Sequence, residues 1–228
     1  MTISLILPCR NEETNLAEVL RSIPANIDEI IVVSNNSSDH TVDVAKEVAV
    51  ENPGVKVLED NRTLGGIGYG FAHISGIAAA NGDFIVGGDG DATYPFEETE
   101  NIIRFMEEKQ LDFVSCNRYP VPKFVQIPLM LRIGTNLLNL EILLLYGLKI
   151  KDTLSGMWVF RNSIKDALNL TMGDWNLSPQ IKLNAALNPK IRFAEYPIKQ
   201  KNRLGKTKQQ YFKTGFNHAF WILKNRFF

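Results

Sequence analysis

The 228-residue sequence is poor in cysteine and carries no net charge. Its two cysteines, Cys9 and Cys116, are too few and too far apart along the chain for a disulfide framework, and neither belongs to a paired-cysteine metal motif. We therefore expect a reducing compartment. The 25 lysines and arginines balance 25 acidic residues. This balance argues against a nucleic-acid partner, because such proteins need an excess or a stripe of positive charge.

The sequence also shows no pattern typical of a secretory signal and no uninterrupted hydrophobic run, so we expect no secretory signal. No basic segment or small-residue cleavage site accompanies the short apolar run at the N-terminus. The most apolar segment, residues 124–149, is interrupted by Arg132, Asn136, Asn139 and Glu141, whereas a membrane-spanning helix needs about 20 predominantly apolar residues. We expect this segment to be interfacial or buried. We expect the protein in the cytoplasm, either free or bound peripherally to the inner face of the membrane.

The first half of the chain alternates short apolar strands with helical stretches. The predicted strands cover residues 3–7, 29–33, 55–59 and 83–87. This alternation predicts one α/β domain with right-handed crossovers and a mainly parallel sheet. Ligands of such sheets bind at the carboxyl ends of the strands. This sequence has polar loops at three of those ends, at residues 8–13, 34–41 and 88–95.

Asp89 and Asp91 stand one residue apart, directly after a predicted buried strand. Two carboxylates held so close cannot both stay ionised cheaply unless a cation intervenes. Oxygen ligands suit Mg²⁺ or Mn²⁺, and Mg²⁺ commonly binds through one or two carboxylates together with substrate phosphates. The alternative is a simple turn, since aspartate, glycine and proline all favour turns. The position beside two other polar loops favours a site for a metal and a nucleotide diphosphate.

Several segments, in order, resemble the inverting family-two glycosyltransferases of the GT-A fold. They are "LILPCRNEETNL", "EIIVVSNNSSDHT", "GDFIVGGDGDATYP", "NRYPV", "KDTLSGMWVFR" and "NRLGKTK". The sequence is most similar to dolichol-phosphate mannose synthase and the bacterial polyprenyl-phosphate sugar transferases. The resemblance covers nearly the whole chain and implies a single domain with a Rossmann-like GT-A fold and a mainly parallel central sheet. Residues 1–95 would form the half that binds the nucleotide sugar, and residues 96–228 the acceptor half with a C-terminal amphipathic helix.

The same resemblance implies a metal-dependent inverting hexosyltransferase. It would move a sugar from a UDP- or GDP-linked donor to a polyprenyl phosphate. An alternative acceptor is a hydroxyl group of a glycan or a small molecule, in which case Asp152 would act as general base. A third alternative is a non-catalytic protein that binds nucleotide sugars, because Ser34 and Asn35 replace the aspartates that are usual in the second loop.

The resemblance also implies roles for individual residues. The expected contacts of the nucleotide sugar are Pro8, Arg10, Asn11, Glu12, Asn35, Asp89 and Gly90, and the expected metal ligands are Asp89 and Asp91. The expected catalytic residues are Asp91, Asp152 and Arg203. The expected ligands of the acceptor phosphate are Arg118, Arg132 and Lys206. For Arg132, snorkelling or pairing with Glu141 is the alternative, because it interrupts an apolar segment.

The C-terminal stretch is basic and carries an apolar stripe. No acidic residue follows Glu195, and phenylalanines and a leucine recur at spacings of three and four between Phe212 and Phe227. Such a stripe is buried in a core in most helices, but a basic helix with exposed aromatic residues can also lie in a membrane interface. The sequence leaves both interpretations open.

Overall fold

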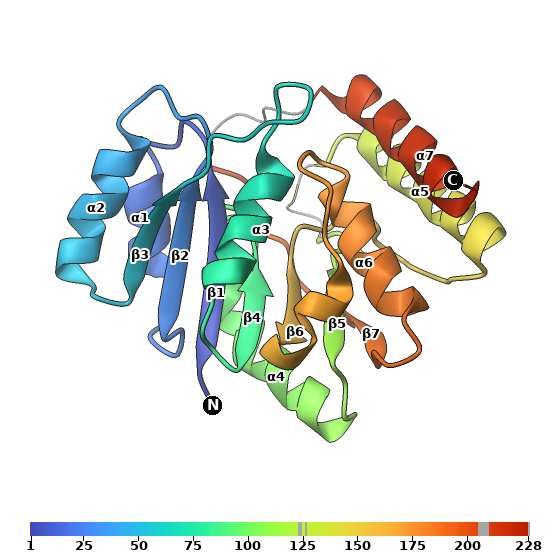
Figure 1. Cartoon of the computed structure of the whole chain (residues 1–228), viewed down its shortest axis with the longest axis horizontal. Helices are drawn as coiled ribbons and strands as arrows, with labels where there is room; N and C mark the ends of the chain where they lie inside the picture. The colour runs from blue at the N-terminus through green and yellow to red at the C-terminus, as the bar shows by residue number, and fades with distance from the viewer. Residues whose placement is uncertain (123–124, 126, 205–209, 228) are drawn as a thin grey trace.

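The computed structural model describes residues 1–122, 125, 127–204 and 210–227. Its strands are β1 (Ile3–Cys9), β2 (Glu29–Ser34), β3 (Val55–Glu59), β4 (Phe84–Gly87), β5 (Phe113–Asn117), β6 (Trp158–Arg161) and β7 (Phe193–Pro197). They form one sheet in the order β3-β2-β1-β4-β6-β5-β7 (Figure 1). Strand β6 runs antiparallel to β4 and β5, and the other neighbouring pairs are parallel. The predicted α/β fold with a mainly parallel sheet is confirmed.

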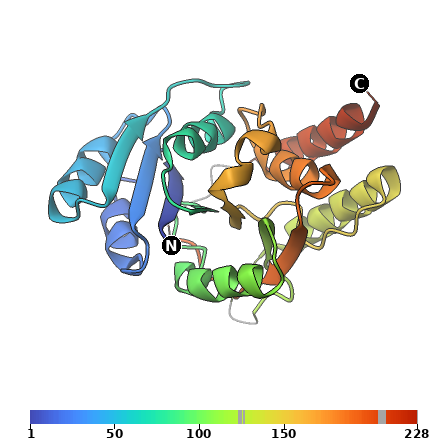
Figure 2. The same ribbon diagram turned by 60° about the horizontal axis from the view of Figure 1, so that its bottom comes forward.

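Helices cover both faces of this sheet (Figures 1 and 2). They are α1 (Leu16–Ser22), α2 (Thr41–Glu51), α3 (Tyr69–Ala79), α4 (Thr99–Glu108), α5 (Leu129–Tyr146), α6 (Leu177–Leu187) and α7 (Tyr211–Phe227), with short 3₁₀ turns at Phe96–Glu98, Asn162–Ile164 and Asp166–Leu168. One apolar core joins α1, α2 and α4 to the sheet, and a second joins α3 and α6 to its other face. Every residue of β2 and β4 is therefore buried, which explains why these strands lack polar alternation.

Helices α5 and α7 pack side by side at one end of the molecule (Figures 1 and 2). Leu138 and Ile142 of α5 and Ile222 of α7 share a small core there. Among the described residues, α5 is the one helix long and apolar enough to cross a membrane by length and composition. The expectation that the polar interruptions disqualify this segment as a membrane span was wrong by this criterion of length and composition, because Arg132 and Glu141 are the only charges among the 18 residues of α5.

Candidate functional site

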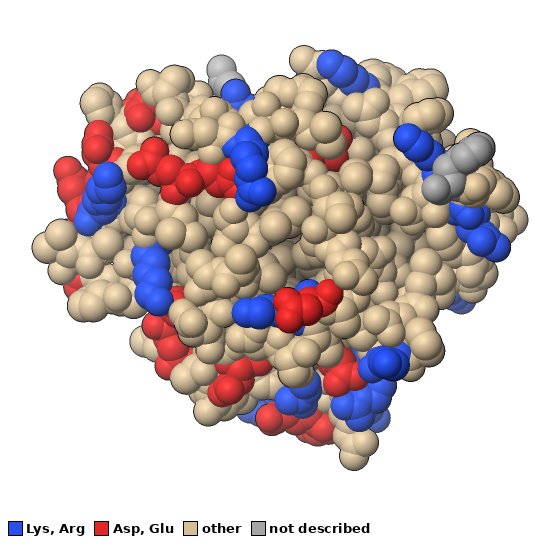
Figure 3. Space-filling view, in the orientation of Figure 1, with Lys and Arg blue, Asp and Glu red and all other residues tan. Residues whose placement is uncertain are grey.

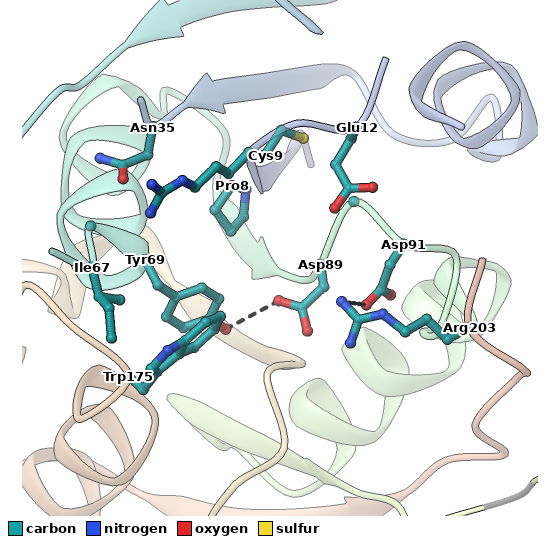
Figure 4. Close-up of a pocket in the computed structure, with 13 residues that line it drawn as sticks. Pro8, Cys9, Glu12, Asn35, Ile67, Tyr69, Asp89, Asp91, Trp175 and Arg203 are labelled. Atoms are coloured by element: carbon teal, nitrogen blue, oxygen red, sulfur yellow. Dashed lines mark hydrogen bonds and ion pairs between the residues drawn. The ribbon is translucent and has the colours of Figure 1, made fainter. Parts of the chain in front are cut away.

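A pocket lies at the carboxyl ends of β1, β2 and β4 (Figure 4). Its lining residues are Pro8, Cys9, Arg10, Glu12, Asn35, Ile67, Gly68, Tyr69, Asp89, Gly90, Asp91, Trp175 and Arg203. The three polar loops predicted from the sequence supply most of these residues. The start of α3, the loop before α6 and the segment after β7 complete the walls. The second half of the chain therefore contributes to the pocket through Trp175 and Arg203.

Asn11, one of the expected nucleotide contacts, is not among the lining residues. It joins the first loop to the second instead. Its backbone nitrogen donates to Ser37 Oγ at 3.2 Å, and its Oδ1 accepts from Ser38 N at 2.8 Å. Its φ of 52° lies in the left-handed region, which asparagine tolerates better than most residues. Asn11 thus holds the two loops in register beside the pocket.

Asn35 is buried at the end of β2. Its Nδ2 donates to the backbone oxygens of Asp60 and Arg62, the latter at 3.0 Å. Its Oδ1 accepts a long bond of 3.4 Å from Asn36 Nδ2. The backbone oxygens after β3 therefore accept the hydrogen bonds of the amide nitrogen. The amide oxygen, Oδ1, is the atom that can still accept a hydrogen bond from a ligand.

The two aspartates of the strand-end motif face the same pocket. Asp91 is 2% exposed; its Oδ1 accepts from Thr93 N at 3.0 Å, and its Oδ2 forms an ion pair with Arg203 Nη2 at 2.8 Å. Asp89 Oδ1 accepts from the hydroxyl of Tyr69 at 3.1 Å. Burial, and next the negative charge of Asp91, raise the pKa of Asp89 to about 7. The structure thus brings two acidic side chains together where the sequence predicts a cation.

Among the described residues, no three His, Cys, Asp or Glu side chains form a group that could hold a metal ion. Asp89 and Asp91 nevertheless fit Mg²⁺ or Mn²⁺, which can bind one or two carboxylates and complete the coordination shell with phosphate oxygens and water. Their oxygens belong to the chemical class that these cations prefer. In this structure the guanidinium of Arg203 provides the positive charge next to Asp91.

Two aromatic residues of the pocket, Tyr69 and Trp175, were not predicted as site residues. Their ring centroids lie 4.4 Å apart with the planes inclined by 32°. A signal for Trp175 does exist in the sequence: it stands in the polar turn "GDWN", outside any apolar stripe. Tyr69 opens a helix with mostly apolar residues, and nothing in that pattern separates it from a core position.

Arg118 and Asp152 form a buried bidentate ion pair that does not line the pocket. Arg118 Nε and Nη2 donate to Asp152 Oδ2 and Oδ1 at 2.7 and 2.8 Å, and Arg118 N donates to Oδ2 at 3.0 Å. Burial raises the pKa of Asp152, but the charge and hydrogen bonds of Arg118 outweigh it, so this pKa lies below its usual range. Both carboxylate oxygens are engaged, and the role of Asp152 as a general base stays a prediction.

Lys182 of α6 is fully buried, and it contacts the loop that follows Asp152. Its Nζ donates to the backbone oxygens of Thr153 and Ser155 at 2.7 and 2.6 Å. Burial lowers the pKa of Lys182 to about 7, against the opposing effect of the Asp152 charge. The lysine therefore fixes the backbone that follows Asp152.

Neither described residue expected at the acceptor phosphate, Arg118 or Arg132, lines the pocket. Arg132 is exposed on α5 and is not in the pocket lining, and Lys206 lies outside the described residues. The alternative pairing of Arg132 with Glu141 is not found among the ion pairs of the described residues. Nine positions along one helix separate the two by about 13.5 Å along the helix axis. Arg118 is thus the one described member of this set that lies near the buried charges of the site.

The sheet order, together with a pocket that combines an acidic pair and an arginine at the strand ends, defines a GT-A glycosyltransferase domain. The chain belongs to the glycosyl transferase family 2, whose domain matches residues 4–168. The predicted family and fold are confirmed.

The chain spans about half the length of one similar protein and most of the length of another. The chain is 26% identical over 232 residues to the low-salt glycan biosynthesis hexosyltransferase Agl6 of Haloferax volcanii, covering 98% of this chain but 54% of that protein. It is 28% identical over 218 residues to the UDP-N-acetylglucosamine–dolichyl-phosphate N-acetylglucosaminyltransferase of Methanococcus voltae, covering 86% of this chain and 84% of that one.

Solved structures show the same fold. Glucosyl-3-phosphoglycerate synthase of Mycobacterium tuberculosis, crystallised with Mn²⁺, UDP and glucosyl-3-phosphoglycerate, has a TM-score of 0.69 at 19% identity, with 99% of this chain and 79% of that one covered. Mannosyl-3-phosphoglycerate synthase of Rubrobacter xylanophilus has a TM-score of 0.68 at 17% identity, with 98% and 72% covered.

Proposed function

We propose that the chain is a metal-dependent inverting glycosyltransferase that moves a hexose from a UDP- or GDP-linked donor to a polyprenyl phosphate. The observation that carries this proposal is the pocket that unites Asn35, Asp89, Asp91 and Arg203 at the strand ends. Asn35 suits a nucleotide base, the two aspartates suit a metal-bound diphosphate, and Arg203 suits a phosphate of the leaving group. The relative from Methanococcus voltae is named for a dolichyl phosphate acceptor, which supports the choice of lipid.

The donor would lie across the three loops. Asn35 Oδ1 is an acceptor with spare capacity, and the ring N–H of uracil or of guanine is a matching donor. Asp89 and Asp91 would hold Mg²⁺ or Mn²⁺, which neutralises charge that develops on the diphosphate leaving group. Arg203 already reaches Asp91 from the segment after β7, so it is placed to hold a phosphate oxygen beside the carboxylates.

The state of Asp152 favours a phosphate acceptor over a hydroxyl acceptor. A hydroxyl group must lose a proton to a base as it attacks the anomeric carbon. A phosphate monoester is already an anion: its oxygen forms the new bond to carbon while the bond from that carbon to the diphosphate breaks. Asp152 is committed to Arg118 through both oxygens. In the proposed reaction it positions this arginine near the acceptor.

The surface of α5 and α7 supports a lipid-bound substrate. Each helix presents exposed apolar side chains, and we define the apolar face by the side chains of Leu129, Met130, Ile133, Leu137, Leu140, Leu143, Leu144, Phe212, Phe216, Phe220, Leu223 and Phe227. Exposed apolar patches of this kind mark interaction sites on most proteins. The two helices carry four basic residues against Glu141 alone. The charges visible over them in Figure 3 are basic. We propose that this face rests on the anionic inner leaflet.

A turnover assay tests the proposal. The purified protein is incubated with Mg²⁺ or Mn²⁺ and a panel of UDP- and GDP-sugars, with and without liposomes that contain polyprenyl phosphate, and release of nucleoside diphosphate is measured. Asp91→Ala should abolish release. Asp166→Ala, which changes an exposed aspartate outside the pocket, is the matched control and should retain it.

Each outcome decides between the candidates. Release that needs the lipid and is lost in Asp91→Ala supports the synthesis of a lipid-linked sugar. Release with a glycan or small-molecule alcohol in place of the lipid supports the hydroxyl acceptor. Nucleotide-sugar binding without release under every condition contradicts a catalytic role.

A further inference from the structure

One wall of the pocket is aromatic. Trp175, in the loop before α6, lies against the ring of Tyr69 at the start of α3 (Figure 4). The hydroxyl of Tyr69 donates in turn to Asp89, so this aromatic pair is tied to the acidic pair. The indole is half-buried and lines the pocket. Part of its surface is therefore exposed to whatever the pocket binds.

The place of this wall indicates which part of a donor it would contact. In a nucleotide sugar the hexose is bonded directly to the diphosphate, so the hexose ring lies next to the groups that bind the diphosphate. Asp89 and Asp91 are those groups under the proposed function. Under the same proposal Asn35 binds the base of the donor, and it lies in a strand-end loop and not in the aromatic wall. The wall formed by Trp175 adjoins the acidic end through Tyr69.

An aromatic ring suits a hexose because its flat apolar surface packs against the C–H groups of the sugar ring and leaves the hydroxyl groups to polar partners. We infer that Trp175 seats the hexose ring of the donor and contributes to the choice among donor sugars. This inference rests on the proposed function and adds a residue that the sequence motifs do not include.

The loop that carries Trp175 is held in place before any ligand binds. Gln180 Oε1 accepts from the backbone nitrogens of residues 171 and 172, both at 2.9 Å. Gly173 O accepts from Gly70 N at 2.9 Å. A Cβ atom at Gly70 would lie 2.0 Å from Met172 O, so the start of α3 and this loop touch without room for a side chain. A wall fixed in this way needs no rearrangement to receive a ring.

Helix α7 fixes the other end of the loop through Asn176. The Nδ2 of Asn176 donates to Asp174 Oδ2 at 3.0 Å. A carboxylate only accepts, so Asn176 Oδ1 is the atom that faces His218 Nδ1, 2.8 Å away. His218 must therefore donate from Nδ1. Burial lowers the pKa of His218 to about 4, so the ring is neutral near pH 7. His218 is a positioning residue for the loop.

Calorimetric titration in Mg²⁺ separates the hexose from the nucleotide. UDP and UDP-glucose, and GDP and GDP-mannose, are titrated into the unaltered protein and its variants. Trp175→Leu should weaken binding of the nucleotide sugar about tenfold and leave binding of the bare nucleotide within about twofold. Trp175→Phe should recover most of the loss. Trp221→Leu, a half-buried tryptophan outside the pocket, should change neither affinity.

The positioning role of His218 is tested by the same comparison of affinities for the nucleotide sugar and the bare nucleotide. His218→Leu should reduce the preference for the nucleotide sugar over the bare nucleotide, and His218→Asn, whose amide can replace the Nδ1 donor, should restore it. A purely structural role would lower the thermal midpoint of unfolding without changing that preference.

Equal losses for the nucleotide and the nucleotide sugar in Trp175→Leu would place the indole on the base or the diphosphate and overturn the inference, while the proposed function would stand. Unchanged affinity for both would overturn it as well. If no nucleotide bound to the unaltered protein, the proposed function would fail and this inference with it.

Discussion

Replacing Asp152 by asparagine should lower the free energy of unfolding by about 3 to 5 kcal/mol, the usual cost of breaking a buried ion pair. The structure places this variant within that range for two reasons. Asp152 is fully buried, and the side chain of Arg118 is only 16% exposed, so water can solvate only a small part of the guanidinium that loses its partner. Asparagine also retains one oxygen where aspartate accepts three hydrogen bonds.

Urea unfolding followed by circular dichroism at pH 7 measures the effect. The matched control is Glu51→Gln, which breaks the exposed ion pair between Arg21 and Glu51 and should leave the unfolding midpoint unchanged, because exposed pairs contribute little. The double variant Arg118→Met/Asp152→Leu should regain much of the loss, since it removes both charges. Equal midpoints for Asp152→Asn and Glu51→Gln would refute the argument from burial.

Four further outcomes follow from the structure. Burial lowers the pKa of His73 to about 3 from 6.5; the unfolded chain takes up a proton below about pH 6.5 that the folded chain does not. The thermal midpoint should therefore fall as the pH drops from 6.5 towards 4, and His73→Met should flatten that slope. Arg203→Met should lower kcat/KM at least about tenfold through the loss of a charged contact, with an unchanged value counting against a role for Arg203. Lys182→Met should cost about 2 kcal/mol of unfolding free energy, because two buried carbonyl oxygens lose their donor; a smaller loss than in Glu51→Gln would contradict this. Phe216→Glu should reduce flotation with anionic liposomes, whereas Val50→Glu, on the exposed surface of α2, should not; equal flotation of both variants would remove the apolar face from membrane contact.

The sequence was sufficient to predict which loops meet at the pocket, because the sheet itself positions them. Parallel strands end at one edge of a sheet, so the loops after β1, β2 and β4 had to meet once the strands were identified. The pocket lining contains Pro8, Asn35 and Asp91 from these loops. Local pattern and topology agree here, and no knowledge of side-chain packing was needed.

The rest of the site depends on contacts between distant segments. Trp175 reaches the pocket because its loop packs on the start of α3 with a glycine at the contact, and Arg118 meets Asp152 across 34 positions of the chain. No periodicity encodes either contact. Arg132 shows the opposite case. The sequence pattern singled it out, but the structure places it on the exposed surface of α5, and nothing in its segment predicts which way the side chain faces.

The place of β6 in the sheet has a consequence for how the chain folds during synthesis. Strand β6 pairs with β4 on one side and with β5 on the other, although it follows both in the sequence. Until residues 158–161 leave the ribosome, β4 has one unpaired edge, and β5, whose other partner β7 follows later still, has both edges unpaired. Such edges are the positions at which strands of other chains can add. We expect the nascent chain to be most prone to association in the interval between the completion of β4 and the arrival of β6.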